Sequence, residues 1–223
     1  MFDRCEAARR VFIAIPAYTA TLAYDTAFAL ISAALAMERS GIEVQMKGLE
    51  GNCYIDQARN ELVADFLETN ATDLLFWDSD VGCLPSTVMK LVRSTRPVVA
   101  AIYPKKTDEE EYPVDFIRGT HTLDSEGLIE AKMVPTGLLR INRRVFGEMK
   151  ALAPQYKGRS GRKVRAYFRT DIREAYYGED VEFCRRWREG GGKIRVLPDE
   201  MLSHTGPKAW IGNVGNALRA GKF

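Results

Sequence analysis

The stretch Leu74-Leu-Phe-Trp-Asp-Ser-Asp80 decides the fold class of this chain. A short run of large apolar residues, Leu74 to Trp77, is followed at once by two carboxylates, Asp78 and Asp80. Such a run is typical of a strand that is buried on both faces of a parallel sheet. Open α/β sheets bind ligands outside the carboxyl ends of their strands, so the position of this acidic pair predicts a functional site.

The segments on either side of this stretch alternate between strand and helix patterns. Apolar runs predict strands at 11–15, 42–46 and 98–103, and helical periodicity predicts helices at 24–40, 54–68 and 85–94. In the helix at 24–40, the residues expected to face the sheet are Ala27, Leu30, Ile31, Ala34 and Leu35. The alternation predicts an α/β fold with a mostly parallel central sheet flanked by helices.

After residue 103 the pattern changes to shorter pieces rich in proline, glycine and charge. Extended segments are expected at 114–117, 138–141 and 193–197, and helices at 144–151 and 179–189. The basic segment Lys157 to Arg165 contains glycine and serine, which predicts a mobile loop. We expect a single domain over 1–223, with one half at about 11–103 and a smaller, loop-rich half at about 104–223.

Composition excludes several classes of protein. The chain has 223 residues, 46% of them hydrophobic, and a formal net charge of only +2, which does not favour a nucleic-acid or membrane-surface binder. Its apolar stretches fall short of the roughly 20 residues of a membrane span. The cysteines are far apart, with no CxxC pair, and predict reduced thiols in a cytoplasmic protein rather than a zinc knuckle; they are Cys5, Cys53, Cys83 and Cys184.

The acidic pair has the spacing of a metal site. On an extended chain Asp78 and Asp80 point the same way, and their charges repel unless a cation lies between them and a ligand. Mg²⁺ or Mn²⁺, held by one or two carboxylates and by phosphate oxygens, is how proteins bind a nucleoside diphosphate. The alternative is that both aspartates cap the turn that follows the strand.

A second acidic pair lies at the start of the helix at 179–189. Asp180 shares a helical face with the apolar residues Phe183, Cys184 and Trp187, so its carboxylate is expected to face inward. An inward acid at a cleft suits a general base. The alternative is that Glu179 and Asp180 are first-turn acids that stabilise the helix N-terminus.

Arg59 lies on the apolar face of the helix at 54–68, where its guanidinium needs an anionic or carbonyl partner. That partner is either a ligand or Asp56 at i, i+3. The neighbouring Asn60 is open to ligand contact or to packing.

Other polar residues follow apolar strands. His204, in Met201-Leu-Ser-His-Thr-Gly206, is either a structural histidine or a ligand of a borderline cation such as Mn²⁺, and the other histidine is His121. Lys106 follows the strand at 98–103, where its ammonium could bind a phosphate group. The alternative is that Lys105 and Lys106 are an exposed pair on the surface. Two further candidates, a hydroxyl and an unhindered backbone for close approach to a sugar or base, are Thr136 and Gly137.

Taken together, these motifs resemble the GT-A glycosyltransferases, and most closely the small family-2-like and phage or viral members. The segments that carry the resemblance span nearly the whole chain and are Val11 to Pro16, Ala58-Arg-Asn60, Leu74 to Asp80, Thr136-Gly137 with Leu139 to Arg143, Gly178-Glu-Asp180 with Phe183-Cys184, and Ser203-His204. The resemblance implies transfer of a sugar from a nucleotide sugar, UDP favoured and GDP possible, to the hydroxyl of a carbohydrate, lipid-linked or protein acceptor.

The resemblance also implies roles for the residues. The first half would bind the nucleotide, with the nucleoside held by Pro16, Ala17 and Tyr18. Arg59 would contact base or phosphate, Asp78 and Asp80 would hold ribose and metal, and Asn60 and Ser79 would also contact the nucleotide sugar. The metal, Mn²⁺ or Mg²⁺, would be held by Asp78, Asp80 and His204. In inverting members Asp180 would be the base and Glu179 would orient it or the acceptor.

Two other functions fit parts of the sequence. In a haloacid-dehalogenase-type phosphatase Asp78 would be the nucleophile and Asp80 the acid/base, although such a nucleophile normally ends the first strand. In a non-catalytic module that binds a nucleotide sugar or a polyanion, the basic segment from 157 to 173 would hold the ligand.

Overall fold

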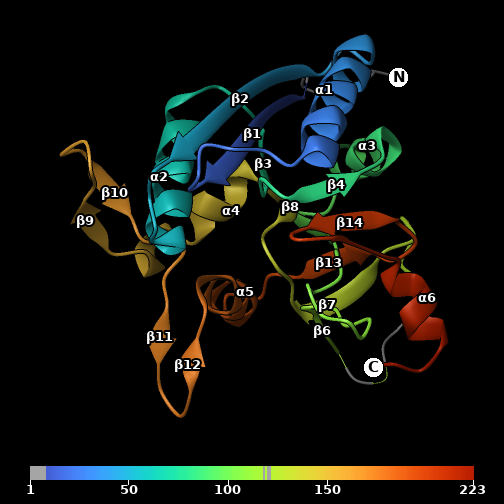
Figure 1. Cartoon of the computed structure of the whole chain (residues 1–223). Helices are drawn as coiled ribbons and strands as arrows, with labels where there is room; N and C mark the ends of the chain where they lie inside the picture. Colours follow the sequence, from blue (N-terminus) through green and yellow to red (C-terminus); the bar gives the residue numbers. More distant parts are fainter. Residues whose placement is uncertain (1–8, 118, 120–121) are drawn as a thin grey trace, which may run out of the picture.

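The computed structural model describes residues 9–117, 119 and 122–223; Cys5 and His121 lie outside the described residues. An eight-stranded sheet in the order β2-β1-β3-β8-β5-β13-β7-β6 forms the centre of the molecule (Figure 1). Its strands are β1 (Arg10–Ala17), β2 (Glu43–Glu50), β3 (Asp73–Trp77), β5 (Val98–Ala101), β6 (Asp115–Phe116), β7 (Ile129–Met133), β8 (Leu138–Asn142) and β13 (Ile194–Leu197). Only β7 and β8 run against the other strands, so the predicted mostly parallel sheet is confirmed.

Helices cover both faces of this sheet. They are α1 (Tyr24–Arg39), α2 (Ile55–Glu68), α3 (Pro85–Arg93), α4 (Arg143–Glu148), α5 (Glu179–Glu189) and α6 (Val214–Arg219), with a 3-10 turn at Lys150–Leu152. Alternate residues of each strand enter two separate cores, one with α1 and α3 and the other with α2, α4 and α5 (Figure 1). This three-layer arrangement is the predicted α/β architecture.

Three small sheets lie beside the central one. The first has the order β15-β14-β4, with β4 at Val81–Cys83, β14 at Leu202–Thr205 and β15 at Ala209–Gly212. Two hairpins project from the body, β9 (Gln155–Lys157) with β10 (Lys163–Arg165), and β11 (Asp171–Ile172) with β12 (Tyr176–Tyr177) (Figure 1). Every helix within the described residues is too short or too polar to cross a bilayer.

The predicted inner face of α1 is wrong except at Leu30. The helix buries Thr26, Ala29, Leu30, Ala33 and Met37 instead, while the predicted Ile31 and Leu35 are 62% and 52% exposed. Apolar residues occupy most of the circumference of α1, so periodicity alone does not select one face. The small side chains of the true face let the helix pack closely on β4 and α3.

The basic segment is an ordered hairpin rather than the predicted mobile loop. β9 and β10 pair across it, and Arg162 binds the carboxylates of Glu61 at 2.9 Å and Asp65 at 2.7 Å on α2. The backbone N–H of Arg159 also donates to Glu61 at 2.9 Å. These buried acids are too far along the chain to be visible in the local pattern of the segment.

Candidate active site

The candidate site lies where strands of opposite direction meet at one edge of the sheet. β1, β3 and β5 end at this edge, and β8 begins there because it runs the other way. The backbone N–H of Asp78 donates to the carbonyl of Gly137 at 2.8 Å, which joins the end of β3 to the start of β8. A cavity of about 390 Å³ at this edge is lined by residues that follow β1, Pro16, Ala17 and Tyr18, and by Asp78, Ser79 and Asp80. The structure thus brings together two predicted groups that are sixty residues apart.

Arg59 bridges the two acidic pairs. Its Nη1 and Nη2 atoms donate to the two carboxylate oxygens of Asp78 at 3.1 and 3.2 Å, and its Nε donates to Glu179 at 3.2 Å. Burial alone would lower the pKa of Arg59, but Asp78 and Glu179 outweigh burial and raise it. The predicted ion pair with Asp56 does not form among the described residues. Arg59 therefore holds both acids with three of its five N–H groups, and one N–H on each of Nη1 and Nη2 is left for base or phosphate contact.

Asp80 belongs to a different cluster from Asp78. Its Oδ2 atom lies 2.6 Å from Lys106 Nζ and 3.6 Å from His204 Nε2. Burial would raise the pKa of Asp80, but His204 and Lys106 together hold it below its usual value. Backbone pairing brings Asp80 and His204 together. β4 begins at the residue after Asp80 and pairs with β14, which contains His204. The N–H of Thr205 also donates to the Asp80 carbonyl at 2.8 Å.

The donor set at Asp80 fits one divalent ion. Nδ1 of His204 lies 2.9 Å from the Pro104 carbonyl and donates to it, so Nε2 is the ring nitrogen that faces Asp80 and, in the neutral imidazole, the one that could bind a cation. Adjacent octahedral ligands at about 2.1 Å from one ion stand about 3 Å apart, so Nε2 and Oδ2, now 3.6 Å apart, would approach by roughly half an ångström around Mn²⁺ or Mg²⁺. Within the described residues no three His, Cys, Asp or Glu side chains form such a set, so Asp78 does not join the pair. Phosphate oxygens and water would complete the shell.

Asp180 stands at the first turn of α5, beside the Arg59 bridge. Its carboxylate is partly buried and accepts the N–H of Val181 at 2.7 Å. Burial raises the pKa of Asp180, and the neighbouring Glu179 raises it further. Glu179 itself is 9% exposed and bound to Arg59. The two acids therefore differ: one is held in an ion pair, and the other keeps an elevated proton affinity, as a general base does.

Tyr103 is the central residue that the sequence reasoning missed. Burial raises its pKa well above the usual value, and Asp78, Asp180 and Asp80 add to this effect, so all three carboxylates lie around one neutral phenol. Its ring packs edge-on against His204 with centroids 4.7 Å apart. The sequence does carry one indication of its role: Tyr103 lies two residues after β5, so it stands at the same edge of the sheet as Asp78.

Gly137 and Thr136 are placed differently from the prediction of direct approach to a ligand. A Cβ atom at Gly137 would lie 2.5 Å from the Tyr103 ring, so the missing side chain makes room for tyrosine. Thr136 is only 2% exposed.

The amide of Asn60 is bound to the backbone of Phe168 through both its nitrogen, at 2.6 Å, and its oxygen, at 2.8 Å. Packing therefore accounts for Asn60.

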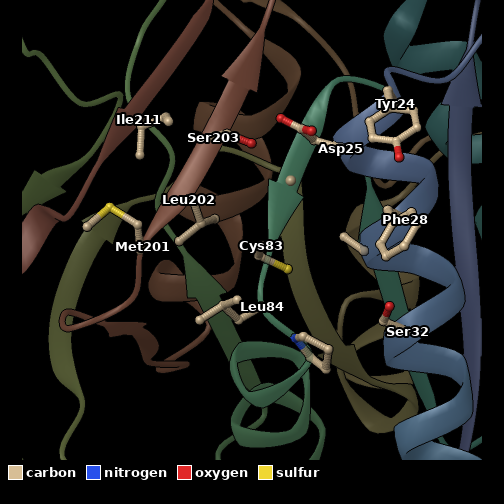
Figure 2. A pocket seen from close by; sticks show the side chains of 13 residues that line it. Tyr24, Asp25, Phe28, Ser32, Cys83, Leu84, Met201, Leu202, Ser203 and Ile211 are labelled. Carbon is tan, nitrogen blue, oxygen red and sulfur yellow. The ribbon is translucent and has the colours of Figure 1, made fainter.

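A second hollow of about 500 Å³ lies between α1 and the small sheet. Tyr24 and Phe28 form one wall, and Met201 and Ile211 stand opposite (Figure 2). Ser203 lines this groove, whereas its neighbour His204 faces Asp80 on the other side of β14, as alternation along a strand requires. The groove is thus separate from the candidate site.

Comparison with known proteins supports the fold. No family model and no curated protein sequence matches the chain. Among solved structures, a Drosophila beta-1,4-galactosyltransferase 7 variant in complex with manganese, UDP-Gal and xylobiose matches over 96% of this chain and 74% of that one, with 12% identity and a TM-score of 0.51. The fold is GT-A-like.

Two further matches have TM-scores below 0.5 and do not bear on the assignment. GalNAc-T7 with UDP, GalNAc and Mn²⁺ matches over 91% of this chain and 46% of that one, at 13% identity and a TM-score of 0.49. The inositol-1-phosphate CTP transferase from T. maritima matches over 89% of both chains, at 7% identity and a TM-score of 0.48.

The GT-A-like arrangement disfavours the phosphatase alternative. Asp78 follows β3, which is the third strand along the chain rather than the first. Both of its carboxylate oxygens accept hydrogen bonds from Arg59, which lowers their nucleophilicity.

The alternative of a polyanion-binding module depends on free basic side chains in the segment from 157 to 173. In the hairpin of β9 and β10, Arg162 is already bound to Glu61 and Asp65.

Proposed function

We propose that this chain is a metal-dependent glycosyltransferase that transfers a sugar from a nucleoside-diphosphate sugar, UDP favoured and GDP possible, to a hydroxyl acceptor. The observation that carries the proposal is the Asp80–His204 pair, because Asp80 also lines the cavity at the ends of β1 and β3. Asp180 lies at the same edge, close enough to Tyr103 to affect its pKa. The GT-A-like fold supports the same reading.

In this proposal each side chain has one role. Pro16, Ala17 and Tyr18 would hold the nucleoside in the cavity that Ser79 also lines. Mn²⁺ or Mg²⁺ at Asp80 and His204 would supply positive charge to the departing diphosphate. Asp78, held by Arg59, is free to accept from ribose only through the outer lone pairs of its carboxylate.

The reaction needs a base for the acceptor and charge for the leaving group. In an inverting reaction, Asp180 takes the proton of the acceptor hydroxyl while that oxygen forms a bond to the anomeric carbon. The bond from the anomeric carbon to the phosphate oxygen breaks, and its electron pair stays on the diphosphate. The ammonium of Lys106 is placed to receive this negative charge. Glu179 keeps Arg59 in position and so holds the second acidic pair beside the first.

Nucleotide binding tests the metal assignment without knowledge of the acceptor. We expect UDP to raise the unfolding temperature of the protein when Mn²⁺ is present and to raise it much less with EDTA. Asp80→Ala should remove the Mn²⁺-dependent part of this shift. Asp115→Ala, which removes an exposed acid at β6, is the matched control and should behave like the parent.

The same assay with GDP and CDP in place of UDP selects the nucleobase. If Asp80→Ala bound UDP and Mn²⁺ like the parent, the metal site would be wrongly assigned. If no nucleoside diphosphate shifted the unfolding temperature of the parent under any of these conditions, the proposed function would be wrong.

A further inference from the structure

Lys106 occupies the oxygen atom of Asp80 that a metal ion at this site would use. Lys106 Nζ lies 2.6 Å from Oδ2, and this is the same oxygen that faces His204 Nε2 at 3.6 Å. An ion that uses both Oδ2 and Nε2 would stand within a few ångströms of the ammonium. Like charges at that distance repel strongly in a site that is only partly open to water.

The position of Lys106 is supported by its surroundings. Its stem passes over Gly206 at the turn between β14 and β15, where a Cβ atom would lie 3.3 Å from Lys106 Cδ and 3.0 Å from the Trp210 ring. Glycine at this position therefore leaves room for the lysine stem beside the indole. The adjacent Lys105 is directed elsewhere and binds Glu111 at 2.9 Å.

We infer that Lys106 is a built-in competitor for the metal at Asp80, and that it couples metal binding to binding of the nucleoside diphosphate. This inference rests on the proposed function. In the nucleotide-free protein the ammonium neutralises Asp80 and weakens metal binding. A diphosphate offers the ammonium another anion, so Lys106 leaves Asp80 for phosphate and the carboxylate becomes available. Each ligand then raises the affinity for the other, and by linkage the two factors are equal.

Mn²⁺ binding without any reaction tests the inference. Free Mn²⁺ is measured by its EPR signal in titrations of the parent, Lys106→Ala and Lys105→Ala, each with and without saturating UDP. Without UDP, Lys106→Ala should bind Mn²⁺ about two- to fivefold more tightly than the parent, the range for loss of a partly exposed charged pair. With UDP this advantage should vanish or reverse, because the variant lacks the contact to phosphate. Lys105→Ala removes the same charge one residue away and should match the parent.

Three results are decisive. Unchanged Mn²⁺ affinity in Lys106→Ala, or an equal gain in both lysine variants, would overturn the inference while leaving the metal site intact. Parent protein that bound no Mn²⁺ even with UDP would overturn the proposed function itself. Lys106→Gln keeps most of the stem over Gly206 without the charge and should reproduce the alanine result, so a packing defect in Lys106→Ala is separated from the loss of charge.

Discussion

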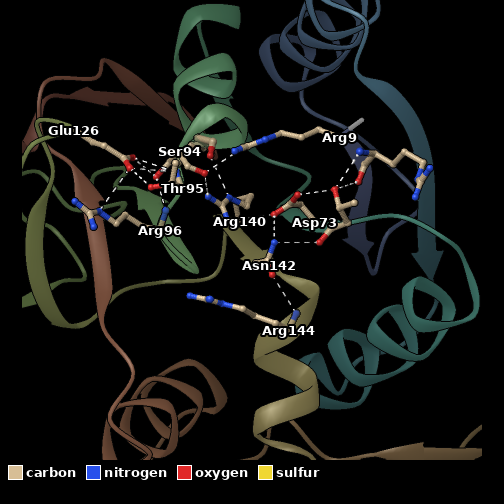
Figure 3. Close-up of polar contacts among 12 residues, drawn as sticks. Arg9, Asp73, Ser94, Thr95, Arg96, Glu126, Arg140, Asn142 and Arg144 are labelled. Carbon is tan, nitrogen blue, oxygen red and sulfur yellow. Dashed lines mark hydrogen bonds and ion pairs between the residues drawn. The ribbon is translucent and has the colours of Figure 1, made fainter. Parts of the chain in front are cut away.

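Two buried arginines, Arg140 and Arg59, bind carboxylates near opposite ends of β3, and their surroundings differ. Arg140 on β8 is 1% exposed and pairs with Leu75 in the middle of β3, and its side chain reaches Asp73 at the start of that strand. It donates to Asp73 at 3.2 Å and to the carbonyls of Leu91 and Ser94 at 3.1 and 2.6 Å (Figure 3). Asn142 also donates to Asp73, at 3.1 Å. One acid and two carbonyls thus satisfy one guanidinium.

Arg59, near the opposite end of β3, is 3% exposed but has two carboxylates as partners, Asp78 and Glu179. Burial lowers the pKa of Arg140 to about 10, whereas the two acids raise the pKa of Arg59. The charge of Arg140 is balanced by one acid, Asp73, inside the protein. Around Arg59 the acids outnumber the cation, and this excess of negative charge borders a cavity, as expected for a site that binds cations or accepts protons.

The largest effect should come from the acid beside Arg59. Asp180→Asn is expected to lower the rate of UDP release from a UDP-sugar by about 10²–10⁴-fold, because the base is lost while the side chain keeps its shape. UDP binding measured by calorimetry should stay within twofold of the parent. Glu189→Gln, at the exposed end of the same helix, is the control and should retain the rate. Equal rates in parent and Asp180→Asn would remove Asp180 from the mechanism.

The next largest effect should be the loss of stability when Arg140 is removed. Arg140→Leu should lower the free energy of unfolding by about 3–5 kcal/mol, because it leaves the buried Asp73 charge unpaired. Urea denaturation measures this change. A loss below about 1 kcal/mol would show that Asp73 finds other partners and that the network is not structural.

A smaller stability change is expected from the corresponding substitution at the candidate site. Arg59→Leu should cost about 1–3 kcal/mol, because the Asp78 side chain is 23% exposed and water can replace part of the lost pairing. Its main effect should be on UDP release, which Arg140→Leu should spare in the folded protein. The contrast between the arginines fails if Arg59→Leu is as destabilising as Arg140→Leu and leaves UDP release unchanged.

The smallest effect is a dependence on pH. The pKa of Asp180 is raised in the folded state, so the unfolded chain releases this proton at lower pH, and the contribution of Asp180 to stability is lost as pH rises through the folded pKa. Asp180→Asn should therefore unfold at a slightly higher temperature than the parent at pH 7, and the difference should disappear at acidic pH. The rate of the parent should fall on acidification at a higher pH than an ordinary aspartate would give. A variant less stable than the parent at pH 7 would contradict this sign.

Local patterns predicted most of the first half of the fold. α5 has the predicted bounds, and α1, α2 and α3 each differ by one residue at one end, because apolar periodicity and neighbouring residues such as Pro85, Gly41 and Gly190 are local signals. The smaller sheet of β4, β14 and β15 was not predicted. Its strands are short, and although β14 and β15 form a local hairpin, β4 pairs with β14 from more than a hundred residues away in the sequence.

By itself the sequence determined that an acidic pair follows a buried strand and that a second pair begins a helix, because both facts depend only on neighbouring residues. Tertiary structure alone decided which charge meets which. It placed Arg59 between Asp78 and Glu179, 120 residues from the latter, and Lys106 against Asp80. It also inserted β8 between β3 and β5, which brings Gly137 under Tyr103. The pairing of buried charges depends on where the strands and helices meet in space, and no local pattern carries that information.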